Sequence, residues 1–475
     1  SSMSNSVRNI NATKPVFSSE SLPPGSSQRL YIEKLVAGGL GLARLNGQVV
    51  LCDGGIPGET VDVEILHRRK GVTQGKILKV HESAESRVSP VCPVIAKCGG
   101  CQLQHLHYEG QLSQKRSMLE DTLRRIGKLS NVKISHVISS VKPYGYRQVL
   151  RMGIGEKRDG VFLGFFEAGT QDLLPVDTCF LVDEEFRVVI DAVRGGLRSL
   201  VMEGMNLDSV EIRWSQLDQS GLLVFRGRAK TKEHIEHLMN ACSKIRNIKG
   251  WIYERVDPSE HDSRRRIWQE PLVRGSDHLW QAFGTLRLKV GYRAFMQANW
   301  DVFQLLGKTI GEWVGDPKGL RILELYAGTG PLGLTLASQG ARVTCVEGNP
   351  TAIHDARESI RVNKIVGCRM KISSVESYLL TVQSEAYDVI LLDPPRSGLN
   401  PKIIEQLETL QVSKLLYISC DAPSLARDIK SLCEKGYEIR RMQPFDMFPQ
   451  TAHLETLVEL VFSQSSENSM KKGME

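Results

Sequence analysis

Two strand ends in the last third of the sequence carry side chains that could act together on one substrate. The apolar run 387–392 ends in Asp393-Pro394-Pro395-Arg396, and the run 414–419 ends at Cys420. The tandem proline stiffens the chain as it leaves the sheet, so Asp393 and nearby carbonyls can face a flat base. The interval between the runs suits one crossover helix, which would make the two strand ends neighbours. The thiol of Cys420 is then a candidate nucleophile, and a buried structural thiol is the alternative.

A glycine-rich turn upstream predicts a nucleotide-like pocket. The buried strand 321–326 runs into Gly328-Thr329-Gly330-Pro331-Leu332-Gly333 and then into a helix. Glycines let a ligand approach the backbone, and the helix N-terminus offers amide donors. A second strand, 342–346, ends at Glu347, whose carboxylate can accept both hydroxyls of a ribose. The motif alone fits a nicotinamide dinucleotide or S-adenosylmethionine (SAM), but a dehydrogenase would not need Cys420 beside the Asp393 turn.

Four cysteines have a spacing that could hold a metal. Cys92, Cys98 and Cys101 are close in sequence, Gly99-Gly100 permits a tight turn between two of them, and Cys179 follows much later. Four thiolates can bind either Zn²⁺ or an iron–sulfur cluster. Three local ligands with one distant ligand favour a [4Fe–4S] cluster over a zinc ribbon, which would show two close pairs. Unliganded thiols are the third possibility.

The elements that must position these residues belong to a protein of several domains. The chain has 475 residues, a 41% hydrophobic fraction and a formal net charge of +7. This length suggests two to four domains, and the mild basic excess permits a polyanion partner without requiring one. No stretch approaches the ~18 apolar residues of a membrane helix. Ten cysteines are too few for a disulfide scaffold, which favours a reducing compartment.

The pattern along the chain changes several times. Residues 1–27 are a Ser-rich stretch expected to be a disordered tail. Short β-prone runs separated by glycines from about residue 29 to 80 predict a small closed barrel, with the basic Arg68-Arg69-Lys70 in a turn. A helix is expected near 108–126, a mixed and β-rich region up to about 290, and a parallel, doubly wound sheet beyond it.

Taken together, these features resemble the RNA uridine-5-methyltransferase family, and specifically its iron–sulfur branch, which acts on 23S ribosomal RNA. The resemblance extends from about residue 29 to the end. It is carried by motifs that occur in the family's order: Gly38-Gly39-x-Gly41, the four cysteines, Phe295-x-Gln297-x-Asn299, Tyr326-x-Gly328-x-Gly330, Asp393-Pro394-Pro395-Arg396, Ser419-Cys420-Asp421 and Thr451-x-His453-x-Glu455.

The resemblance implies an α/β multidomain chain and assigns its parts. It implies an OB-like TRAM barrel for RNA over residues 28–84, a β-rich iron–sulfur domain over 85–290, and a Rossmann-like SAM-dependent methyltransferase domain over 291–475. The helix near 108–126 would pack on the methyltransferase domain. The implied SAM-binding residues are Gln297, Tyr326, Gly328, Gly330, Glu347, Ser374 and Asp393, and the implied [4Fe–4S] ligands are Cys92, Cys98, Cys101 and Cys179.

The implied chemistry is formation of 5-methyluridine in 23S ribosomal RNA, with Cys420 as nucleophile and Glu455 as base. The expected partner is RNA, without a membrane, and the expected state is a monomer in the cytoplasm, or alternatively in an organelle. The alternatives are the same chemistry on transfer RNA, a nicotinamide-dependent oxidoreductase, or a non-catalytic RNA-binding protein. Three residues depart from the family pattern: Pro331, Pro423 and Gln450.

Overall fold

The chain forms two compact units in the computed structural model, which describes residues 23–69, 71–256 and 270–463. One unit comprises residues 1–87 and the other residues 88–475. Of the tail predicted for residues 1–27, residues 1–22 lie outside the described residues, and Ser27 already begins a strand.

The first unit is a six-stranded sheet. Its strands are β1 (Ser27–Tyr31), β2 (Lys34–Val36), β3 (Leu40–Leu45), β4 (Gln48–Cys52), β5 (Thr60–Arg69) and β6 (Val72–Glu82), with the short 3-10 turn η1 (Ala37–Gly39). The order is β1-β5-β6-β4-β3-β2, so the two outer strands follow each other directly in sequence and the sheet must curl to bring its edges together. Its interior is filled by residues such as Ile32, Val50 and Val63. Arg68 and Arg69 end β5 rather than forming a turn, because β5 is longer than predicted, and Lys70 lies outside the described residues.

The second unit begins with α1 (Tyr108–Arg125) and continues into a seven-stranded mixed sheet. This sheet has the order β13-β12-β11-β10-β7-β8-β9. Its strands are β7 (Val149–Lys157), β8 (Gly160–Phe166), β9 (Leu173–Pro175), β10 (Leu207–Ser215), β11 (Ser220–Gly227), β12 (Ile248–Arg255) and β13 (Leu272–Gly275). Helices α2 (Glu184–Arg198) and α3 (Lys232–Cys242) contribute Phe186, Val193 and Leu238 to the core on this sheet. The hairpin β14 (His278–Phe283) and β15 (Leu286–Gly291) leads on to the last sheet.

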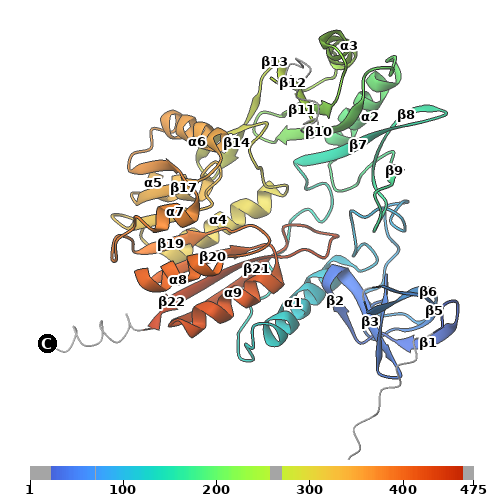
Figure 1. Ribbon diagram of the computed structural model, residues 1–475, viewed down its shortest axis with the longest axis horizontal. Helices are drawn as coiled ribbons and strands as arrows, with labels where there is room; N and C mark the ends of the chain where they lie inside the picture. The colour runs from blue at the N-terminus through green and yellow to red at the C-terminus, as the bar shows by residue number, and fades with distance from the viewer. Residues whose placement is uncertain (1–22, 70, 257–269, 464–475) are drawn as a thin grey trace, which may run out of the picture. The chain divides into compact units, whose positions relative to one another are not determined.

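The last sheet is largely parallel, as the alternating pattern predicts (Figure 1). Its order is β18-β17-β16-β19-β20-β22-β21, and β22 runs antiparallel to both of its neighbours. The strands are β16 (Arg321–Leu325), β17 (Arg342–Glu347), β18 (Cys368–Ile372), β19 (Val389–Leu392), β20 (Lys414–Ser419), β21 (Tyr437–Phe445) and β22 (Glu455–Phe462). The helices are α4 (Trp300–Val314), α5 (Pro331–Ser338), α6 (Pro350–Val362), α7 (Val375–Leu379), α8 (Pro401–Leu410) and α9 (Ala422–Glu434). Both faces of the sheet carry an apolar core, which explains why β19 and β20 are nearly continuous hydrophobic runs.

Helix α1 is far from the last sheet in sequence but packs against its helical layer. Leu119 and Leu123 of α1 are buried in the same core as Ala426 and Ile429 of α9 (Figure 1). The helix begins at the cap residue His107, whose Nδ1 accepts a hydrogen bond from the Gly110 amide at 2.9 Å. This packing brings the polar face of α1 to the loop between β21 and β22.

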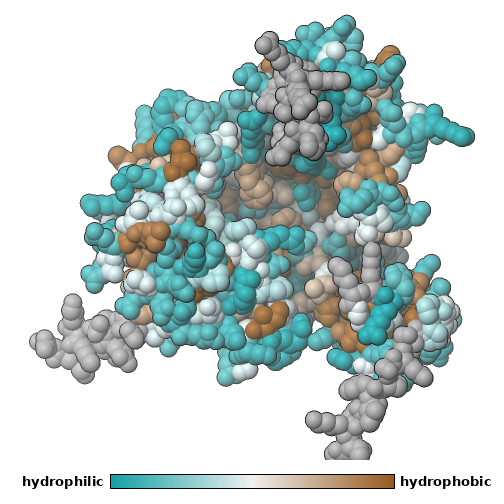
Figure 2. All heavy atoms as spheres, in the orientation of Figure 1, coloured by the Kyte–Doolittle hydropathy of each residue, from teal (hydrophilic) through white to brown (hydrophobic). Residues whose placement is uncertain are grey.

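The surface visible in Figure 2 is mainly hydrophilic, with small separate apolar patches. None of the helices in the described ranges is both long and apolar enough to cross a membrane.

Candidate active site

The carboxyl ends of β16 and β17 form the part of the site predicted for a nucleoside. Tyr326 directly follows β16 with a left-handed φ of 60°, and Gly328 and Gly330 come next with φ of 60° and 80°. The Gly328 amide donates to Glu347 Oε1 at 3.0 Å, and the Asn349 amide donates to Glu347 Oε2 at 2.8 Å. Two backbone donors therefore fix the Glu347 carboxylate at the edge of the sheet. Ser374, the exposed cap of α7, lies beside it, because the Ser373 amide donates to the Glu347 carbonyl at 3.1 Å.

Two further carboxyl groups are buried at this edge. Burial raises the pKa of Glu324, in the middle of β16, to about 8, and the charges of Asp393 and Glu347 act in the same direction. Its Oε1 accepts from the Gly333 amide at 3.3 Å, directly below the glycine turn. Burial also raises the pKa of Asp393 to about 7. The raised pKa values mean that both groups hold their protons readily near neutral pH. A bound cation such as a sulfonium would favour their ionised forms, so the edge is compatible with SAM.

Cys420 lies in a rigid turn between β20 and α9. The Ser419 hydroxyl donates to the Asp421 carbonyl at 2.9 Å, and the Asp421 side chain caps α9 by accepting from the Ser424 amide at 3.0 Å. Burial raises the pKa of the Cys420 thiol to about 11, and the charges of Glu455 and Asp393 raise it further, while Arg396 lowers it. The Cys420 thiol is half-buried, and its pKa responds to the charges of Glu455 and Asp393 at the same edge.

Glu455 reaches this edge because β22 runs in the opposite direction. Ser419 of β20 pairs with Thr456 of β22. Because the two strands are antiparallel, the residue after Ser419, Cys420, comes opposite the residue before Thr456, Glu455. Glu455 is only 4% exposed, and its pKa is raised well above the usual value by burial and by the charge of Asp393. A buried carboxyl group with a raised pKa is a stronger base than a solvated one.

Gln297 comes from a different segment. It is buried between β15 and α4, two residues before Asn299, whose Oδ1 caps α4 by accepting from the Val302 amide at 3.2 Å. Among the described residues, no hydrogen bond connects the Gln297 side chain to the carboxyl edge. The structure thus gathers Tyr326, Gly328, Gly330, Glu347, Asp393, Cys420 and Glu455, with Ser374 beside Glu347.

Sequence reasoning assigned no role to Glu324 and Arg396. Glu324 could have been predicted because it is an acid between apolar residues inside a buried strand. Such a residue is a candidate functional acid rather than an ordinary core residue. Arg396 belongs to the Asp393 turn, but only the fold shows that its charge acts on Cys420. Two of the departures are structurally harmless. Pro331 and Pro423 both lie in the first turn of a helix, where the missing N–H has no intrahelical partner to lose.

The four cysteines proposed as metal ligands lie near one another. Burial raises the pKa of Cys101 to about 12, and the other three thiols act in the same direction. Burial raises the pKa of Cys179 to about 11, and Cys98 and Cys92 add to the effect. The Gly100 amide donates to Cys98 Sγ at 3.4 Å. All ten cysteines are unpaired thiols. In the part of the chain that the structure describes, however, no three His, Cys, Asp or Glu side chains are arranged closely enough to hold a metal.

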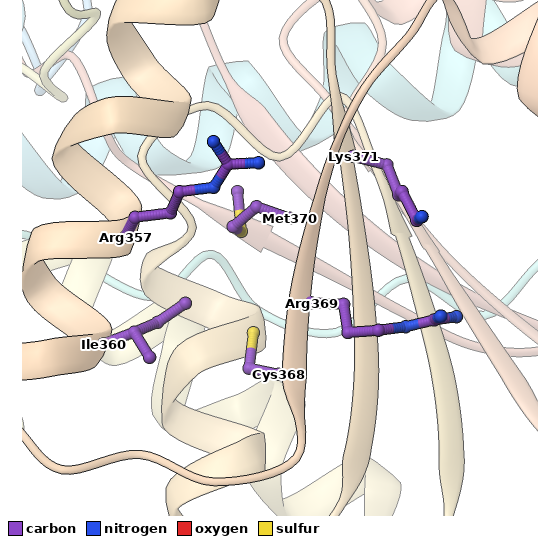
Figure 3. A pocket seen from close by; sticks show the side chains of 6 residues that line it. All are labelled: Arg357, Ile360, Cys368, Arg369, Met370 and Lys371. Carbon is purple, nitrogen blue, oxygen red and sulfur yellow. The ribbon is translucent and has the colours of Figure 1, made fainter.

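A hollow at β18, the outer strand of the last sheet, is not part of the site. It is lined by Arg357 and Ile360 of α6 and by residues 368–371 of β18. Figure 3 shows Arg369 and Lys371 pointing to the opposite side of the strand from Cys368 and Met370. Charged side chains on an edge strand discourage pairing with another chain, which is a sufficient role for them.

Comparison with known proteins agrees with this arrangement. Residues 285–462 match the family model described as tRNA (Uracil-5-)-methyltransferase, and residues 23–78 match that of the TRAM domain. An uncharacterized RNA methyltransferase of Halalkalibacterium halodurans is 29% identical over 444 residues, which cover 90% of this chain and 95% of the relative. One of Aquifex aeolicus is 29% identical over 432 residues, covering 91% and 98%.

The fold agrees as well. The tRNA (uracil-54, C5)-methyltransferase of Pyrococcus abyssi, solved in complex with S-adenosyl-L-homocysteine, has a TM-score of 0.72 at 24% identity. The match covers 91% of this chain and 99% of that one. These matches favour the methyltransferase over the dehydrogenase that the glycine turn alone left open. Residues 285–462 are therefore similar to the tRNA (Uracil-5-)-methyltransferase family, behind a TRAM domain match at residues 23–78, in a chain whose relatives are named RNA methyltransferases.

Proposed function

We propose that the protein methylates carbon 5 of a uridine through a transient bond between Cys420 and carbon 6 of the uracil ring. The observation that carries this proposal is the position of Cys420 at the carboxyl edge, opposite Glu455 and beside Asp393. Carbon 5 of uracil is a poor nucleophile because its electrons are delocalised through the ring. A covalent intermediate divides this difficult reaction into easier steps.

The proposed reaction uses the Cys420 thiol, the methyl group of SAM and the Glu455 carboxylate in turn. The Cys420 thiol loses its proton to solvent, and its sulfur bonds to carbon 6, which moves the electrons of the double bond into an enolate. Carbon 5 then attacks the methyl group of SAM, and S-adenosylhomocysteine leaves. Glu455 removes the remaining proton from carbon 5, the carbon–sulfur bond breaks, and the ring double bond returns. The base must be unstacked for this attack, so the target uridine is single-stranded or flipped out.

For SAM, the residues proposed from the sequence supply complementary groups. Glu347 offers a fixed carboxylate for ribose hydroxyls, and the Gly328–Gly330 turn leaves its backbone open to a ligand. A bound sulfonium would favour ionisation of Glu324 and Asp393, whose pKa values burial raises in its absence. Tyr326, Ser374 and Gln297 are proposed to complete the contacts.

Two substitutions test the covalent scheme. Cys420→Ala should abolish methyl transfer and leave the affinity for SAM within about twofold, because the thiol bonds only to the uracil. Glu455→Gln should trap a methylated protein–RNA adduct that survives a denaturing gel, because the last proton stays on carbon 5. Cys433→Ala, a half-buried thiol of α9, is the matched control and should behave like the wild type. Full activity of Cys420→Ala would refute the scheme.

We propose 23S ribosomal RNA as the substrate, acted on by a monomer in the cytoplasm or another reducing compartment. The proposal rests on the iron–sulfur branch that the cysteine spacing resembles. Transfer RNA is the second candidate, because the structural relative from Pyrococcus abyssi is named for uracil 54 of transfer RNA. Mapping 5-methyluridine in both RNA classes from cells lacking the protein separates the two: loss from 23S ribosomal RNA supports the proposal, and loss confined to transfer RNA overturns it.

We also propose that Cys92, Cys98, Cys101 and Cys179 bind a [4Fe–4S] cluster. Burial, and after it the charges of the neighbouring thiols, raise the pKa of Cys101 and Cys179, and a metal that replaces the protons would compensate the thiolate charges. Methyl transfer moves no electron, so the role assigned to the cluster is structural. Protein purified without oxygen should contain about four iron and four sulfide ions per chain, the composition of one such cluster. Cys101→Ser should lose the iron and the sulfide, and the control Cys433→Ser should keep them. One zinc ion per chain in place of iron would instead show a zinc site and overturn the proposal.

A further inference from the structure

The loop that carries the chain into Glu455 is held by segments from much earlier in the sequence. We call residues 446–454, between β21 and β22, the base turn. At its centre Gln450 is 2% exposed and has a left-handed φ of 74°. A non-glycine residue adopts this conformation only where the surroundings determine it. Gln450 is also one of the three departures from the family pattern.

Hydrogen bonds engage every polar group of Gln450. Its amide N donates to Gln111 Oε1 at 2.9 Å, and its Oε1 accepts from Gln111 Nε2 at 2.8 Å. Its Nε2 donates to the Pro143 carbonyl at 3.1 Å. Its carbonyl accepts from the amides of Gln102 and Leu103 at 3.0 and 2.9 Å, in the loop that follows Cys101. The base turn is thereby bonded both to α1 and to the cysteine loop.

A buried ion pair holds the beginning of the same turn. Lys115 Nζ lies 2.6 Å from Asp446 Oδ1 and donates to the Phe448 carbonyl at 3.0 Å. Both side chains are fully buried, and the Tyr108 hydroxyl donates to the other oxygen of Asp446 at 2.7 Å. Such a pair is costly to bury and fixes a unique geometry only when its remaining hydrogen bonds are made, as they are here.

A general base must lie within hydrogen-bond reach of the proton that it removes, and small displacements cost large factors in rate. The pairing of β22 with β20 and β21 sets its register, and the base turn sets how the chain enters the strand at Glu455. We propose that Gln111, Gln450 and Lys115 are positioning residues for Glu455, and that α1 with the cysteine loop holds the base turn in its catalytic conformation. This inference rests on the proposed role of Glu455 as the base.

The proposal makes a distinctive kinetic prediction. Loss of the contacts should slow proton removal from carbon 5 and leave SAM binding and carbon–sulfur bond formation in place. Gln111→Met keeps the length of the side chain but makes neither hydrogen bond to Gln450, and it also loses the bond from Gln111 Nε2 to the Leu106 carbonyl at 3.1 Å. It should lower kcat about 10- to 100-fold, accumulate the methylated adduct on a denaturing gel, and show a deuterium isotope effect with RNA deuterated at carbon 5 of uridine. The KM for SAM should stay within about twofold of the wild-type value.

Four further variants keep the test decisive. Gln450→Gly tolerates the positive φ and retains the backbone bonds, so it isolates the loss of the side-chain amide and should also accumulate adduct. Lys115→Arg should retain more activity than Lys115→Met, because it keeps the charge opposite Asp446. Leu119→Ala loosens α1 without touching the base turn and should lower the melting temperature with no adduct and no isotope effect.

The outcomes separate the two proposals. Reduced activity of Gln111→Met and Gln450→Gly without adduct and without an isotope effect would show a merely structural role and overturn the inference. Failure of Glu455→Gln itself to trap adduct would instead overturn the assignment of the base.

Discussion

Glu59 in the first unit and Glu455 in the catalytic sheet are both buried, with 0% and 4% of their surface exposed, yet their surroundings shift their pKa values in opposite directions. Burial alone would raise the pKa of Glu59. Hydrogen bonds from Arg87 at 2.7 Å to both oxygens, together with those from the amides of Ile56 and Ala84, outweigh it and lower the pKa. Around Glu455 the neighbouring charge is another carboxylate, Asp393, and the pKa rises.

The contrast shows how the same side chain serves structure in one region and chemistry in the other. A carboxylate whose lone pairs are filled by a guanidinium and two amides is a poor base, because protonation would break those bonds. A carboxyl group pressed against another acid takes up a proton readily. Glu59 therefore ties the loop before β5 to residues 84–87 at the end of its unit, whereas Glu455 is suited to receive the proton from carbon 5.

The largest expected effect tests the catalytic half of this comparison. Glu455→Gln should lower kcat about 10³-fold, equivalent to about 4 kcal/mol in the activation barrier. It should not lower the free energy of unfolding, because glutamine removes a group whose charged form is disfavoured by burial. Single-turnover kinetics and denaturant unfolding measure the two quantities. A stability loss comparable to the rate loss would make Glu455 a structural residue like Glu59.

The complementary change tests the structural half. Glu59→Gln should cost about 2 kcal/mol in the unfolding of the first unit, because Arg87 and the two amides lose their charged acceptor. With saturating RNA, kcat should remain within about twofold of the wild-type value. Thermal unfolding of the first unit measures the change in stability, and turnover assays measure kcat. A large fall in kcat at unchanged stability would contradict the structural role of Glu59.

The raised pKa of Cys420 predicts a strong pH dependence. The thiol, with a pKa of about 11, is protonated at neutral pH, and the reactive form is the thiolate. Because deprotonation activates it, kcat/KM for RNA should rise about tenfold per pH unit between about pH 7 and pH 9. Initial rates in buffers of constant ionic strength provide the measurement. A flat profile would mean that the thiol is already ionised in the enzyme.

The smallest expected effect concerns Arg396, the cation that opposes the acids around Cys420. Arg396→Gln should raise the pKa of the thiol further and displace the pH profile to higher pH. Since this side chain is exposed, the rate at neutral pH should fall only about two- to threefold. The difference between variant and wild type should shrink at high salt, where the exposed charge is screened. A difference that is independent of salt would indicate direct contact with the RNA instead.

Several parts of the fold could be predicted from local patterns. The apolar runs at 321–326, 342–346, 387–392 and 414–419 form β16, β17, β19 and β20, and the glycine turn lies where it was expected. The carboxyl ends of parallel strands meet at one edge, so the proximity of Glu347, Asp393 and Cys420 follows from the strand assignment. The prediction placed Arg68 and Arg69 in a turn because short runs give no measure of how far a strand continues.

The sequence by itself determined the types of reactive group and the parallel sheet that collects most of them, because hydrophobic periodicity and strand ends are local properties. Only the tertiary structure decided that Glu455 stands opposite Cys420, since that depends on the antiparallel insertion of β22. It alone decided that Gln111 bonds to Gln450, 339 residues later. A hydrogen bond between polar side chains so far apart leaves no periodic pattern, because it arises when two separately formed elements pack.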